Sequence, residues 1–85
     1  MTDKEIFLSV LPNVNFMTPN VESYVRKGKY ICEVSKGGGF DGTYMVGVTV
    51  VNAETRRHEC DLSKSFTNTI RKEAMKDAMY YIENL

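Results

Sequence analysis

The stretch that decides the fold runs from residue 29 to residue 52 and reads KYICEVSKGGGFDGTYMVGVTVVN. On both sides of its glycine run, apolar and polar residues alternate with the period of a β-strand that buries one face. The residues expected to face the core are Tyr30, Cys32, Val34, Tyr44, Val46, Val48 and Val50. After a turn at residues 52–54, the alternation resumes at His58, Cys60 and Leu62. The pattern predicts a three-stranded antiparallel meander.

Helical spacing of apolar residues appears before and after this sheet. Thr2 and Glu5 match a capping box, and the apolar residues that follow predict a short helix over about residues 3–11. Near the other end, apolar residues recur three and four positions apart, which predicts a long amphipathic helix. Its apolar stripe consists of Phe66, Ile70, Ala74, Ala78, Tyr81, Ile82 and Leu85.

A further segment over residues 18–28 has two interpretations. Thr18 and Pro19 match the start of a helix and Gly28 matches its end, so we expect a helix there. The alternative is a strand over residues 21–26 that turns at Gly28 into the next strand. The elements together predict an α+β protein in the order α(α)βββα, with helices packed on one face of the antiparallel sheet. The 85 residues are expected to form one domain, in which residues 1–17 extend a core over 18–85.

The composition limits the partners of the protein. Eleven basic and eleven acidic residues cancel, so the whole molecule exerts no long-range attraction on polyanions. The chain contains neither a run of about 20 apolar residues nor the apolar start of a signal peptide. We therefore expect a cytoplasmic protein that does not bind or span a membrane. Two cysteines and one histidine without metal-ligand spacing predict no metal and no cofactor.

Two motifs suggest chemistry that their context does not support. Residues 37–42 (GGGFDG) match the dinucleotide fingerprint, but that motif requires a strand followed by a helix. Here the run links two strands, so we expect a flexible hairpin loop, with phosphate contact through its backbone amides as the alternative. Cys60 and His58 lie two apart on one predicted strand face, about 7 Å apart and too far for a hydrogen bond. A core thiol is inert, and we therefore expect no enzyme.

Basic residues gather in three clusters, which are Arg26 to Lys29, Arg56 to His58, and Arg71 with Lys72 and Lys76. Together with these basic clusters, the predicted order of elements over residues 18–85 resembles that of the double-stranded RNA-binding domain, which has an α-β-β-β-α fold. Residues 18–28 are similar to its first helix, residues 29–34 to its first strand, and residues 37–50 to its loop and second strand. Residues 71–74 (RKEA), followed by Ala78, are similar to the lysine-rich start of its last helix.

The resemblance implies a small non-enzymatic protein that binds the phosphate backbone of structured or double-stranded RNA through a local basic face. The residues expected to contact RNA are Arg71, Lys72, Lys76, Arg56, Arg57, Lys36, Gly38 and Gly39. Such proteins recognise the shape of an RNA helix more than its sequence.

A second hypothesis is a phage-type accessory protein that binds and inhibits a host protein such as a nuclease or toxin, with or without RNA in the complex. Balanced charge suits a protein interface. Met75, Met79, Tyr80 and Tyr81 also exceed what a narrow helical stripe can bury. The sequence leaves the oligomeric state open, a homodimer included.

Overall fold

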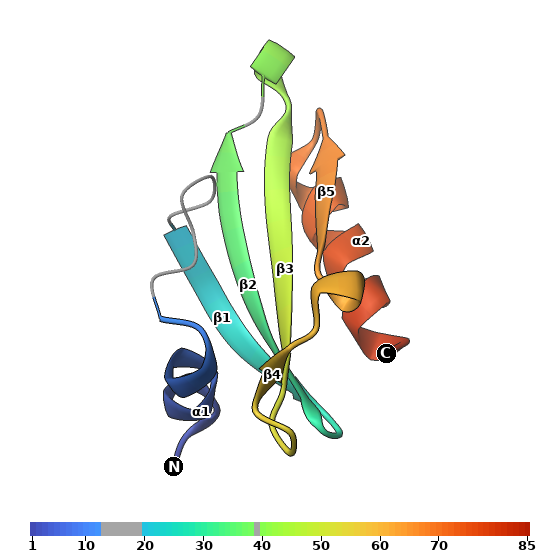
Figure 1. The fold of residues 1–85 in the computed structure, drawn as a ribbon. Coiled ribbons are helices and arrows are strands. Elements are labelled where there is room, and N and C mark those ends of the chain that lie inside the picture. Colours follow the sequence, from blue (N-terminus) through green and yellow to red (C-terminus); the bar gives the residue numbers. More distant parts are fainter. Residues whose placement is uncertain (13–19, 39) are drawn as a thin grey trace.

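The computed structural model describes residues 1–12, 20–38 and 40–85. An antiparallel sheet lies between a helix near the N-terminus and a helix at the C-terminus (Figure 1). The elements are α1 (Asp3–Val10), β1 (Asn20–Lys27), β2 (Tyr30–Gly38), β3 (Tyr44–Asn52), β4 (Arg57–His58), β5 (Lys64–Asn68) and α2 (Arg71–Glu83), with short 3-10 turns η1 (Phe40–Gly42) and η2 (Cys60–Leu62). The predicted α+β class and antiparallel sheet are confirmed.

The sheet has more strands than the three that the sequence predicted. β1, β2 and β3 form an antiparallel meander, and both β4 and β5 pair with β3. Because β2 occupies one whole edge of β3, β4 and β5 follow one another along its other edge. They act as one strand that η2 interrupts. The third strand, predicted over residues 57–62, is therefore a strand only at residues 57–58, and residues 60–62 form η2.

The segment predicted as a second helix is the edge strand β1. Its residues pair with β2 from Lys27 opposite Tyr30 to Asn20 opposite Lys36. Gly28 adopts a φ of 59° in the tight turn between the two strands, a conformation that glycine takes without strain. The helix prediction was wrong for residues 20–27, because pairing with β2 outweighs the local start and stop signals. Residues 13–19, which include Thr18 and Pro19, lie outside the described residues.

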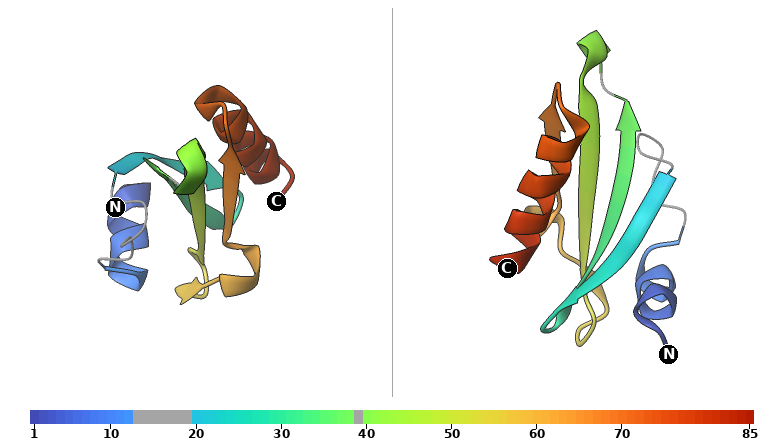
Figure 2. Two further views of the ribbon diagram at one scale, coloured as in Figure 1. Left: turned by 90° about the horizontal axis from the view of Figure 1, so that it is seen from above. Right: turned by 180° about the vertical axis from the view of Figure 1, so that it is seen from behind.

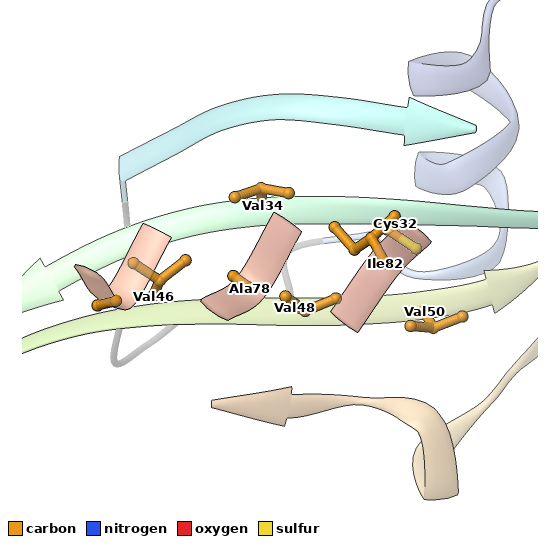
Figure 3. Packing of buried hydrophobic residues seen from close by; sticks show 8 residues of the cluster. Cys32, Val34, Val46, Val48, Val50, Ala78 and Ile82 are labelled. Carbon is orange, nitrogen blue, oxygen red and sulfur yellow. The ribbon is translucent and has the colours of Figure 1, made fainter. Parts of the chain in front are cut away.

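α2 covers one face of the sheet. It buries Ala74, Ala78 and Ile82 against the alternating core residues of β2 and β3, which confirms the predicted stripe at these positions. Figure 3 shows Ala78 and Ile82 over Val34, Cys32 and Val48. The helix begins at Arg71 and not at Phe66, because residues 64–68 pair with β3 as β5.

α1 covers the opposite face, which differs from the expectation of both helices on one face. Thr2 and Glu5 form the predicted capping box, and Phe7 is fully buried against Ile31 and Val51. Since Ile31 and Cys32 are neighbours on one strand, they point to opposite faces, and the two helices lie on either side of the sheet (Figure 2). Ile31 and Val51 break the alternation of the sequence and make this second face apolar.

A tyrosine on β1 holds a buried carboxylate on β2. The Tyr24 hydroxyl donates a hydrogen bond of 2.9 Å to Oε2 of Glu33, a residue that is only 2% exposed. Desolvation, followed by this hydrogen bond and the charge of Glu33, raises the pKa of Tyr24 to about 12. Burial raises the pKa of the Cys32 thiol to about 11. The folded protein therefore holds both protons more tightly than the unfolded chain.

This difference predicts a loss of stability at alkaline pH. A raised folded pKa contributes stability that is complete below the unfolded pKa and disappears as pH rises through the folded value. The contribution of Cys32 should disappear from about pH 9 to 11, and that of Tyr24 from about pH 10 to 12. Urea unfolding at several pH values measures the loss. Tyr24→Phe should flatten the decline above pH 10, whereas Tyr80→Phe, at a side chain that is 71% exposed, should not. Equal declines in both variants would contradict the prediction.

Candidate nucleic-acid interface

The first turns of α2 carry three basic residues on a rigid support. Arg71, Lys72 and Lys76 are all exposed, and we call them the basic segment of α2. Burial of Ala74 and Ala78 fixes the helix on the sheet below them. Lys72 and Lys76 are one helical turn apart and therefore lie on the same side of α2. Among the residues that the structure describes, neither lysine forms an ion pair.

Arg71 joins the start of α2 to the end of the sheet that carries the glycine-rich turn. Its guanidinium carbon lies 4.7 Å from the centre of the Tyr44 ring, a cation–π contact. Tyr44 is the first residue of β3 and pairs with Gly38, the last residue of β2. The basic segment and the β2–β3 turn therefore belong to the same end of the molecule, as Figure 1 shows. Gly39 lies outside the described residues.

The β2–β3 turn connects two strands, as the sequence predicted, and no helix follows it. Its last residues form η1, in which Asp41 has a φ of 64° and Gly42 a φ of 72°. Both values lie in the left-handed region that favours glycine or aspartate. The exposed Asp41 carboxylate places a negative charge on this turn. Any phosphate that approaches the turn must therefore meet this charge as well as the backbone amides.

Arg56 and Arg57 lie at the opposite end of β3 from the basic segment. The nine residues of β3 separate the two ends, which corresponds to about 26 Å of extended chain. Arg56 has a φ of 58° in the β3–β4 turn, and its Nη1 donates a hydrogen bond of 3.1 Å to Ser9 Oγ on α1. The structure therefore does not bring Arg56 and Arg57 together with the basic segment.

Lys36 is half-buried near the end of β2 and forms an ion pair with Glu22 of β1. The Glu22 carboxylate therefore competes with a phosphate for Lys36. Arg26 is likewise paired, with Asp3 of α1 at 3.2 Å. Of the basic residues expected to contact RNA, only Arg71, Lys72 and Lys76 thus form a local cluster on one element.

The outer side of α2 also exposes apolar surface. Tyr80 is 71% exposed and Met79 is 36% exposed, whereas Met75 and Tyr81 pack against the core. Ile70, just before the helix, is 57% exposed. Of the four residues that were expected to exceed what the helix can bury, two are exposed, Met79 and Tyr80. These side chains lie on the same helix as the basic segment.

The placement of Cys60 corrects the expectation of a buried thiol. Cys60 is exposed at the start of η2, and its Sγ lies 3.3 Å from Nδ1 of His58. The expected separation of about 7 Å assumed a strand that continues past His58. The 3-10 turn shortens this distance. No glycine or proline marks the break in the sequence, so the alternation gave no signal of it.

No helix in the described ranges is long and apolar enough to span a membrane. The same residues contain no group of three or more histidine, cysteine or acidic side chains arranged to hold a metal ion. No family model, curated protein or solved structure matches the chain.

Proposed function

We propose that this protein is a small, non-enzymatic RNA-binding protein that contacts the phosphate backbone of structured RNA through the basic segment of α2. The supporting observation is the exposure of Arg71, Lys72 and Lys76 within the first two turns of a helix that is fixed on the sheet. Phosphate contacts require cations that rigid elements present together. The first-turn amides of α2 add partial positive charge at the same end.

The charge distribution limits the strength of this binding. Glu73 and Asp77 alternate with the lysines on α2, and the whole chain has no net charge. Three phosphate contacts correspond to a slope of about −2 to −3 in a plot of log affinity against log salt concentration. Backbone contacts carry no base information, so duplexes of different sequence should bind with similar affinity.

Fluorescence anisotropy with a labelled duplex RNA, titrated between 50 and 300 mM salt, tests the proposal. We expect Lys72→Gln/Lys76→Gln to reduce the magnitude of the salt slope by about 1.5 to 2, because each lysine that contacts phosphate contributes about 1. Arg56→Gln/Arg57→Gln is the matched control, since it removes the same charge at the opposite end of β3. It should leave the slope unchanged.

Two results would contradict the RNA proposal. The first is no binding of the wild-type protein at 50 mM salt. The second is an equal reduction of the slope by both double variants, which would indicate a general effect of net charge and not a local contact.

A second candidate function is inhibition of a partner protein such as a nuclease or toxin, and the exposure of Tyr80 and Met79 favours it. Tyrosine and methionine are enriched in protein interfaces, where they supply large apolar contacts. A stoichiometric protein partner that remains bound after nuclease treatment, combined with no affinity for RNA, would favour this candidate over the first.

A further inference from the structure

Around η2, three side chains form a chain of contacts that the RNA proposal does not use. Sγ of the exposed Cys60 lies 3.3 Å from Nδ1 of His58. The other ring nitrogen, Nε2, lies 3.2 Å from Oγ of Ser63. A thiol, an imidazole and a hydroxyl in this order match a nucleophile, its base and a group that orients the base.

The hydrogen bonds of Ser63 favour one of the two tautomers of neutral His58. The Ser63 hydroxyl donates to the carbonyl oxygen of Glu59 at 3.0 Å and accepts from the backbone N–H of Val50 at 2.9 Å. With this proton directed to Glu59, the Ser63 oxygen acts as an acceptor towards His58. The tautomer of neutral His58 that matches this arrangement donates from Nε2. The lone pair of Nδ1 then faces the thiol of Cys60 and can accept its proton.

Neighbouring elements hold this arrangement in place. His58 pairs with Val51 across the sheet, and the Glu59 N–H donates to the Val50 carbonyl at 2.8 Å. On the other side of η2, the Tyr81 hydroxyl of α2 donates to the Leu62 carbonyl at 2.6 Å. The base and the nucleophile are therefore positioned by the fold itself.

We propose that Cys60 is a reactive thiol that undergoes disulfide exchange with small-molecule disulfides, with His58 as the base. His58 Nδ1 accepts the Sγ proton, and the thiolate attacks one sulfur of the disulfide R–S–S–R. The S–S bond breaks, a mixed disulfide forms between Cys60 and R–S, and the released R–S⁻ takes the proton back from the imidazolium. The small disulfide is the only oxidant, and the step balances without another co-reactant.

The size of the effect follows from thiol ionisation. A thiol with an ordinary pKa of about 8.5 is only about 3% ionised at pH 7. Full ionisation would therefore accelerate the exchange by at most about 30-fold, and the lower nucleophilicity of a more acidic thiolate offsets part of this gain. We expect an acceleration of at least about threefold from His58.

The experiment uses oxidised glutathione at pH 7 and follows adduct formation on the intact protein by mass spectrometry. The wild-type protein should form the Cys60 mixed disulfide at least threefold faster than His58→Gln. Cys32 is an internal control in the folded samples, because it is fully buried there and should remain unmodified. Cys60→Ser should form no adduct.

Unfolded wild-type protein in urea supplies a reference that does not depend on how the variant folds. There, Cys60 has lost the fixed contact with His58, so it should react at least threefold more slowly than in the folded protein. Peptide mapping assigns the adduct to Cys60, because unfolding also exposes Cys32. A difference below threefold in either comparison would overturn the proposal. None of these readouts depends on RNA.

Discussion

Replacement of Phe7 by alanine is expected to lower the free energy of unfolding by about 3–5 kcal/mol. Phe7 is fully buried between α1 and the sheet, where it packs against Ile31 and Val51. Its ring also meets the Tyr24 ring edge-on, with 5.3 Å between the centroids. The eight residues of α1 are too few for a stable isolated helix, so the helix depends on this contact.

The effect should be large relative to the whole stability, which is about 4–13 kcal/mol for a chain of this length. Urea unfolding followed by circular dichroism measures it. Leu8→Ala is the matched control on the same helix, because Leu8 is 38% exposed and should lose about 1 kcal/mol or less. If the two variants were equally destabilised, α1 would not be held mainly through Phe7.

Ile82→Ala is the second substitution with a large expected effect, a loss of about 2–5 kcal/mol. Ile82 is 1% exposed near the end of α2 and lies beside Cys32 in Figure 3. The other fully buried residues of α2 are Ala74 and Ala78, which let the helix approach the sheet closely. Ile82 is thus the largest side chain that α2 buries completely. Its removal leaves a cavity, because the short neighbouring side chains cannot fill the space.

The control for this substitution is Tyr80→Ala, two residues earlier on the exposed side of α2. Tyr80 is 71% exposed, so its removal should change the unfolding free energy by about 0.5 kcal/mol or less. Thermal and urea unfolding of both variants provide the measurement. A loss from Tyr80→Ala as large as that from Ile82→Ala would contradict the packing of α2 through its apolar stripe.

Much of the central fold could be predicted from local pattern. The alternation at Cys32, Val34, Val46 and Val48 correctly indicated a hairpin and its core face under α2, although the opposite face is also partly buried. The capping box at the start of α1 was also predicted correctly. Both signals depend on residues that are close together in the chain, and steric and hydrogen-bonding preferences at that range are encoded locally.

The candidate site was predictable only in part. The spacing of Lys72 and Lys76 placed both on one exposed side of a helix, and α2 presents them in this way. The sequence could not show that Glu22 pairs with Lys36, or that β3 separates Arg56 from Arg71. These outcomes depend on strand register and direction, which pairing with distant segments decides.

The sequence by itself determined the α+β class, the β2–β3 hairpin and the buried stripe of α2, because the spacing of apolar residues is a local property. Only the tertiary structure decided that residues 20–27 form a strand, that the helices cover opposite faces, and that Cys60 meets His58. Each of these depends on contacts with segments whose position local pattern does not specify. An edge strand gains its ladder hydrogen bonds from its neighbour, and η2 adds bonds to β3 and α2 to those within its own turn.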